Sequence, residues 1–303
     1  MIVVRPYNAT LASTNVPEND HTAWAAGTTY SVGQKVIVLA DKKIYESLQA
    51  ANTGKVPKDN PAWWLDLGAM NAHKMFDEFV NTKTINPNSI QVKLDVEKID
   101  YVALFGVKGT DIELKLWNEG ETELLWEKSI NLIYDMAIVN SSSWYEYFFG
   151  DSGTKEDFST LLGTIAFVGV LEINIINTGL DAECSKVVVG RQFKIGLTQY
   201  GASAGIVDYS RNLVDDFGRR YMKQGNWSKR NDCTVLIENT SLDPVYRLLS
   251  SLRGTATAWV TDSRLDEGGR FESLILYGFY RDFNVVIQHP TMSECRIELE
   301  GMI

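Results

Sequence analysis

The chain has 303 residues, 45% of them hydrophobic and 22% charged, which is the composition of a folded globular protein long enough for two or three domains. Its formal net charge of −10 argues against a protein that binds nucleic acid, because phosphate binding depends on concentrated Lys and Arg. The three cysteines, Cys184, Cys233 and Cys295, are widely spaced and odd in number. We therefore expect free, reduced thiols and no cysteine metal site.

The first residues, MIVVRPYNAT, contain no basic region followed by a long apolar run. No later segment reaches the roughly 18 uninterrupted apolar residues that a membrane helix needs. The sequence therefore predicts a chain that folds in a cytoplasm, without a signal peptide and without a membrane span.

Residues 21–68 are rich in aromatic side chains, which in so small a unit supply most of the area available for burial. The order AW-x-x-GTTY-x-x-G-x-x-V, then a turn, IYES, Pro and Trp, resembles the chitin-binding and cellulose-binding modules of bacterial enzymes, of the carbohydrate-binding module family 5/12 type. The matching positions are Trp24, Gly27, Tyr30, Gly33, Val36, Tyr45 and a Trp at 63 or 64. The resemblance implies a small three-stranded fold, which we assign to a domain of residues 1–69.

The same resemblance implies a sugar-stacking face built on an aromatic pair shortly after the scaffold tyrosine. Leu48 and Gln49 occupy those positions, so this platform is missing. Consecutive tryptophans on an extended segment point to opposite sides, so only one of Trp63 and Trp64 can enter the core. We expect a structural or docking module, and the candidate glycan-binding residues for the alternative are Trp24, Trp63 and Trp64.

Residues 70–190 are predicted to form a jelly-roll-like β-sandwich, because segments such as SIQVKLDV and DIELKLWN alternate with a period of two. The loop and strands of residues 76–118 resemble sandwiches of the galactose-binding or discoidin type. Asp77 and Glu78 in this loop are possible calcium ligands, but a solvated loop is the preferred interpretation.

The segment SSSWYEYFFGD at residues 141–151 concentrates aromatic side chains. Alternation along a strand prevents all of them from sharing one buried side, so we expect part of this surface to face another domain or subunit. The candidate interface residues in this segment are Trp144, Tyr145, Tyr147 and Phe149.

Residues 191–303 are predicted to form an antiparallel β domain with one helix near residues 243–253. Pro244 lies in the first turn of that helix, Val245, Leu248, Leu249 and Leu252 form an apolar stripe, and Gly254 follows its end. Two charged turns precede the helix and add Arg219, Arg220 and Trp227 to the candidate interface.

Catalytic patterns are weak throughout the chain. Paired carboxylates of a glycosidase would have to come from Asp208, Asp215 and Asp216, but adjacent acids before Arg219 and Arg220 are more typical of an ion-pair surface. The histidines His21, His73 and His289 lack metal-ligand spacing, and no phosphate-binding or dinucleotide motif is present. We therefore expect no enzymatic activity, no cofactor and no metal.

From residue 70 to 303 the order of segments resembles structural proteins of tailed-bacteriophage tails, found at the tail tip, hub or baseplate. The segments are IGLTQYGASAGIVDYSRN, VDDFGRRYMKQGNWSKR, the helix with LLSSLRGTATAWV, LYGFYRDFNV and a terminal IELEGM strand. The resemblance implies a virion protein that assembles with copies of itself and with other tail proteins. Two alternatives remain: a receptor for host cell-surface polysaccharide, and a polysaccharide hydrolase or its accessory protein.

Overall fold

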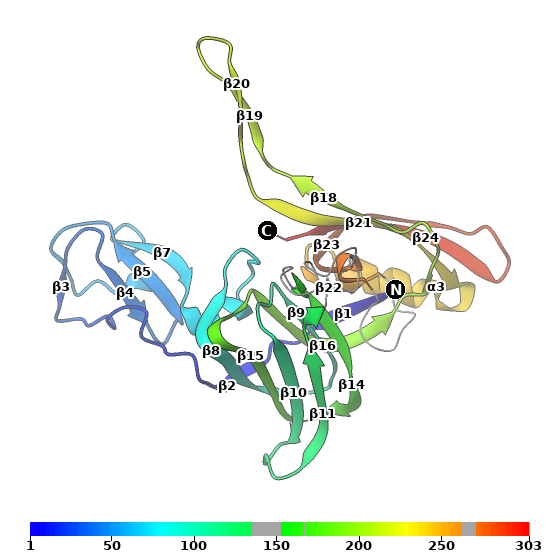
Figure 1. The fold of residues 1–303 in the computed structure, drawn as a ribbon, viewed down its shortest axis with the longest axis horizontal. Helices are drawn as coiled ribbons and strands as arrows, with labels where there is room; N and C mark the ends of the chain where they lie inside the picture. The colour runs from blue at the N-terminus through cyan, green and yellow to red at the C-terminus, as the bar shows by residue number, and fades with distance from the viewer. Residues whose placement is uncertain (135–152, 167, 262–270, 303) are drawn as a thin grey trace, which may run out of the picture.

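The computed structural model describes residues 1–134, 153–166, 168–261 and 271–302, and the chain within these ranges consists mainly of antiparallel β-strands. The predicted mainly β fold is confirmed. Figure 1 shows a small N-terminal module beside two larger packed sheets, with a long hairpin projecting from one of them.

Among the described residues, the largest element is a ten-stranded sheet that takes strands from the whole length of the chain. In sheet order its strands are β14 (Phe158–Ala166), β9 (Ile99–Phe105), β16 (Lys186–Lys194), β1 (Ile2–Pro6), β22 (Thr257–Val260), β23 (Ile275–Val286), β24 (Met292–Gly301), β21 (Trp227–Glu238) and β17 (Leu197–Thr198), and β18 (Ser203–Asp208) also pairs with β21. Strand β1 lies between β16 and β22, so the beginning of the chain is held in the middle of this sheet.

A five-stranded sheet packs against one end of the large sheet. Its strands, in order, are β11 (Leu124–Asn131), β10 (Asp111–Asn118), β15 (Gly169–Cys184), β8 (Thr84–Val96) and β2 (Thr10–Thr14). Alternate residues of its central strands, such as Leu94, Leu114 and Ile173, share one apolar core with Leu104 and Val189 of the large sheet. The predicted β-sandwich is therefore present, because period-two alternation gives each sheet one apolar face to bury.

The N-terminal module has the three-stranded sheet that its sequence predicts, with the order β4 (Lys35–Val38), β5 (Lys43–Ser47) and β7 (Trp64–Ala69). A short pair, β3 (Thr29–Tyr30) with β6 (Asn52–Thr53), and the 3-10 helix η1 (Pro57–Asp59) complete it. Its core contains Tyr30, Val36, Tyr45 and Trp64. A second 3-10 helix, η2 (Asn71–Phe76), leads from the module into β8.

The predicted C-terminal helix is α3 (Leu242–Ser251), which follows the 3-10 helix η3 (Asn239–Ser241). Val245, Leu249 and Leu252 from its apolar stripe pack over Trp259 in the core on that face of the large sheet. Ser241 occupies the N-cap position but makes no side-chain capping hydrogen bond. Burial of the stripe is thus the main local reason for the helix.

The domain limits at residues 69 and 190 remain predictions, and hydrogen bonding crosses both of them. Strands β1 and β2 lie within the predicted domain of residues 1–69 but pair within the two larger sheets, so the compact N-terminal module begins after them. Strand β16 runs across the second limit. The remaining elements are the pairs β12 (Ile133–Tyr134) with β13 (Gly153–Thr154) and β19 (Arg211–Val214) with β20 (Arg220–Lys223), and the 3-10 helix η4 (Glu272–Leu274).

Candidate assembly surface

A hairpin projects from the large sheet and carries the charged turns that the sequence analysis selected (Figure 1). We call residues 209–226, which join β18 to β21 and contain β19 and β20, the arm. Val214 pairs with Arg220 in its antiparallel ladder. Asp215 Oδ1 accepts hydrogen bonds from the backbone N–H of Phe217, at 3.0 Å, and of Arg219, at 2.7 Å. Gly218 adopts a φ of +78°, which glycine tolerates best, so this sequence encodes an ordered turn at the end of the arm.

The arm exposes large apolar side chains far from any core of the described residues. Phe217 at its turn is 88% exposed, and Tyr221 and Met222 on β20 are 55% and 67% exposed. Soluble surfaces rarely concentrate such side chains without a binding role. The exposure of these side chains makes the arm a candidate interface.

Hydrogen bonds hold the base of the arm on the sheet. The Tyr209 backbone N–H donates to the carbonyl of Asn226 over 3.0 Å, which closes the hairpin at its base. The Gly225 N–H donates to Ser210 Oγ at 3.0 Å. A Cβ on Gly225 would lie 2.5 Å from the Tyr209 carbonyl oxygen, so glycine is required where the two strands approach most closely.

The expected interface residues fall into two groups. Arg219 and Arg220 lie exposed on the arm, and Trp227, 54% exposed, begins β21 at its base. The aromatic residues Trp144, Tyr145, Tyr147 and Phe149 lie outside the described residues. Sequence reasoning missed Phe217, Tyr221 and Met222, although apolar residues interleaved with charges in VDDFGRRYM were the available signal.

Two of the three carboxylates considered for hydrolysis accept hydrogen bonds from nearby backbone N–H groups. Asp215 is engaged by the turn, and Asp208 Oδ1 accepts the Ser210 N–H at 2.8 Å. Hydrogen bonding to Ser210 lowers the pKa of Asp208, whereas a general acid needs a raised one. Asp216 lies exposed beside Asp215. The arrangement does not favour glycosidase chemistry.

The loop considered for calcium holds a lysine ammonium group. Lys186, which is buried, donates hydrogen bonds from Nζ to the backbone carbonyls of Phe76, at 3.4 Å, and Asp77. Its Nζ also lies 5.2 Å from the centre of the Tyr277 ring. Burial lowers the pKa of Lys186. The Asp77 carboxylate accepts hydrogen bonds from Thr82 Oγ1, so both Asp77 carboxylate oxygens and the Asp77 carbonyl already have donors.

No cluster of three or more His, Cys, Asp or Glu side chains in the described ranges is arranged to hold a metal ion. Within the same ranges, no helix is both long and apolar enough to cross a membrane.

The candidate glycan residues differ strongly in exposure. Trp64 is 3% exposed, packs edge-on against Tyr30 with ring centres 5.3 Å apart, and donates from Nε1 to the Lys55 carbonyl. Trp64 is therefore a core residue, and its buried ring does not offer a face on which a sugar could stack. Trp63 and Trp24 are half-buried, and Lys55 Nζ lies 5.6 Å from the centre of the Trp63 ring. Only one of the two consecutive tryptophans is fully buried, in agreement with the sequence prediction.

Polar contacts join the sandwich to the strand that carries the arm. Asp157 accepts hydrogen bonds from the Gly106 N–H, at 2.9 Å, and from Lys229 Nζ on β21, at 2.5 Å. Glu272 Oε1 accepts from the backbone N–H groups of Glu156 and Asp157, at 3.0 and 3.1 Å. Lys229 is two residues from the start of β21, so this junction fixes the sheet near the base of the arm.

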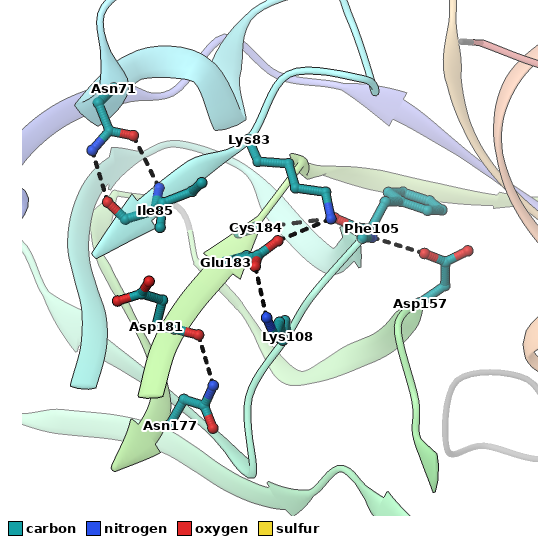
Figure 2. Close-up of polar contacts among 11 residues, drawn as sticks. Asn71, Lys83, Ile85, Phe105, Lys108, Asp157, Asn177, Asp181, Glu183 and Cys184 are labelled. Atoms are coloured by element: carbon teal, nitrogen blue, oxygen red, sulfur yellow. Dashed lines mark hydrogen bonds and ion pairs between the residues drawn. The ribbon is translucent and has the colours of Figure 1, made fainter. Parts of the chain in front are cut away.

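Figure 2 shows a second polar cluster, in which Glu183 lies between two lysines. Glu183 accepts hydrogen bonds from Lys83 Nζ and Lys108 Nζ, each at 3.0 Å. Burial alone would raise the pKa of Glu183, but its hydrogen bonds to Lys108 and Lys83 lower it overall. The cluster joins β15, the segment before β8 and the loop after β9. Its contacts satisfy one another, which indicates a structural role.

No family model matches the chain, and no curated protein matches it significantly. Among solved structures, the chain is similar to the F5/8 type C domain of a Bacteroides fragilis protein, at 12% identity and a TM-score of 0.29. The match covers 41% of this chain and 82% of that domain.

Proposed function

We propose that the chain is a structural protein of a phage tail, at the tail tip, the hub or an adaptor position, that assembles with copies of itself and anchors neighbouring tail or fibre proteins. The observation that supports this best is the arm, with Phe217 88% exposed at its turn. The assignment to a phage tail rests on the resemblance of residues 70–303. In this proposal the chain folds in the host cytoplasm and functions in the virion.

The arm suits assembly because it combines order with exposed binding chemistry. Its turn and base are fixed by backbone hydrogen bonds, so little conformational entropy is lost when a partner binds. Arginine and aromatic side chains dominate the energy of protein interfaces, and the arm presents Arg219, Arg220 and Phe217 together. The ion pair between Asp157 and Lys229 then connects β21, which carries the arm, to the sandwich.

The first test of the proposal is location. Antibodies raised against the full chain should label the tails of purified phage particles in immunogold electron microscopy, and mass spectrometry should find several copies per particle. Absence of the chain from particles, while infected cells contain it, would contradict the proposal.

A second test removes the arm. Asp208 pairs with Trp227, so residues 209–226 can be replaced by Asn-Gly, which favours the tight turn of a two-residue hairpin. The shortened chain should fold but fail to enter particles in a complementation assay. The urea-unfolding midpoint of the shortened chain should match that of wild type, which separates loss of the arm from misfolding.

The alternative of a glycan receptor is favoured by one observation. Trp63 remains half-exposed beside Leu48, which is 43% exposed and whose backbone N–H donates to the Trp63 carbonyl at 2.9 Å. Lys55 above the Trp63 ring competes for the face on which a sugar would stack. Binding of the full chain to host cell-wall polysaccharide that is lost in Trp63→Ala would support the alternative.

A further inference from the structure

The net charge of the chain is located in one part of the sequence. Residues 70–190 contain 19 acidic and 9 basic residues, which gives the full −10 of the chain, so the segments before and after are neutral. The arm departs from this balance, because it contains four basic residues and two acidic ones and carries +2. A basic projection on a protein with an acidic sandwich has a complementary surface on a second copy.

An exposed acidic segment of the sandwich lies where β10 joins β11. We call residues 119–125 the acidic turn; it contains Glu119, Glu121 and Glu123 and no basic residue. Leu124 and Leu125, the first two residues of β11, complete this segment and are 39% and 42% exposed. Acidic and apolar groups thus lie side by side, as the basic and apolar groups of the arm do.

The acidic turn is ordered. Asn118 Oδ1 accepts hydrogen bonds from the Thr122 N–H, at 2.9 Å, and the Glu123 N–H, at 3.3 Å. Lys93 pairs with Glu121 from the neighbouring sheet surface. The Glu119 and Glu123 carboxylates form no ion pair with a described residue. Two carboxylates on a fixed turn are therefore open to a cation from outside.

The arm and the acidic turn lie at opposite ends of the molecule in Figure 1, so they do not meet within one chain. Two complementary surfaces at opposite ends form a head-to-tail contact, and repetition of such a contact produces a closed ring or a filament. A two-fold dimer would instead require both contacts, arm to acidic turn and acidic turn to arm, to form at once between the same two copies.

We propose that the arm of one copy binds the acidic turn of the next, with Arg219 and Arg220 against Glu119 and Glu123. Phe217 of the arm then covers Leu124 and Leu125. This inference rests on the proposed function, because it names the partner surface through which the tail protein assembles. The occupant of the acidic turn is thus a second copy of this chain.

The test compares the self-association of full-length variants by sedimentation velocity over a range of protein concentrations. The variants Arg219→Glu/Arg220→Glu and Glu119→Lys/Glu123→Lys should each weaken association by at least about tenfold, because like charges then face each other. The chain that carries all four substitutions should recover association, because both signs are exchanged. The recovered variant excludes misfolding as the cause of the loss.

The control Asp59→Lys/Glu238→Lys changes the net charge by the same amount as the acidic-turn variant, at exposed positions in the N-terminal module and at the end of β21 far from the arm. It should leave association unchanged. Association should also decrease as salt is raised, because ions screen the pairs.

Three results would overturn the inference: a wild-type chain that stays monomeric at every concentration, an acidic-turn variant that associates like wild type, or no recovery in the fourfold variant. The proposed function is decided separately by labelling of particles. If the chain is present in tails but its self-association does not depend on the acidic turn, the proposed function stands and the proposed contact between the arm and the acidic turn is wrong.

Discussion

The hydroxyl of Tyr209 donates a hydrogen bond to Glu300 Oε1 over 2.8 Å, so the first residue of the arm is attached to β24, the last strand of the chain. Glu300 also forms an ion pair with Arg281, whose Nε lies 3.5 Å from the Glu300 carboxylate. The arm therefore leaves the sheet at a fixed point, and its direction depends on β23 and β24 as well as on its own ladder.

Tyr209→Phe should loosen the arm without unfolding the protein. A hydrogen bond of this kind contributes about 1 kcal/mol, so amide exchange in residues 209–226 should accelerate by about fivefold while global stability falls by no more than about 1 kcal/mol. Hydrogen exchange read by mass spectrometry measures both effects. Tyr246→Phe on α3 is the matched control and should leave exchange in the arm unchanged; equal acceleration in both variants would contradict this role of Tyr209.

Local sequence patterns predicted the individual strands and the helix of this fold. They could not predict which strands, distant in sequence, pair with one another. Alternation along DIELKLWN gives β10, and the apolar stripe from Val245 to Leu252 gives α3, because both periods are properties of neighbouring residues. The position of β1 between β16 and β22 depends on contacts with residues far along the chain, which no local pattern contains.

The candidate interface on the arm was predictable only in part, because the sequence shows the chemistry of its residues but not their position in the fold. Arg219, Arg220 and Trp227 stood out by their chemistry, and all three lie exposed on the arm or at its base. The length of the projection and the exposure of Phe217 were not predictable, because an apolar residue in a charged turn is equally consistent with a buried anchor. The separation of the arm from the acidic turn is a tertiary property.

Trp63 and Trp64 should respond oppositely to truncation. Trp64→Ala removes the largest side chain of a small core, so the N-terminal module should lose about 3–5 kcal/mol and unfold locally. Trp63→Ala should cost about 1 kcal/mol or less, because its ring is only partly buried. Limited proteolysis with intact-mass detection measures both, as cleavage within residues 20–69.

The contrast also decides which variant is useful for sugar-binding assays. Only Trp63→Ala leaves a folded module on which loss of binding is interpretable. Rapid cleavage of Trp63→Ala, or resistance of Trp64→Ala, would show that the core is not centred on Trp64.

All three cysteine thiols should be unreactive in the folded protein. Burial raises the pKa of Cys184 and Cys233 to about 12 and that of Cys295 to about 11. Thiolate is the reactive form, so near pH 8 each side chain is both shielded and protonated. A colorimetric disulfide reagent should titrate three thiols only after denaturation.

Thr240→Cys provides the positive control, because Thr240 is exposed just before α3. This variant should react with one equivalent in the folded state. A fast-reacting thiol in the native wild-type chain would contradict the burial of all three.

The Glu183 cluster should make stability depend on acid. The pKa of Glu183 is lowered from its ordinary value of 4.5 in the folded protein by Lys108 and Lys83. Its contribution is thus fully present above pH 4.5 and is lost as the pH falls through the folded pKa. Because the side chain of Glu183 is 15% exposed but both lysines are about half exposed, solvent screening limits the contribution to about 1 kcal/mol.

Glu183→Gln keeps the shape of the side chain and removes its charge. Urea unfolding followed by tryptophan fluorescence should therefore show the variant about 1 kcal/mol less stable than wild type near pH 7, with the difference shrinking toward zero as the pH falls below the folded pKa of Glu183. Glu238→Gln is the matched control, since Glu238 is exposed and forms no ion pair with a described residue. A stability difference for Glu183→Gln that stays constant across this range would mean that the carboxylate contributes through packing and neutral hydrogen bonds, and not through its charge.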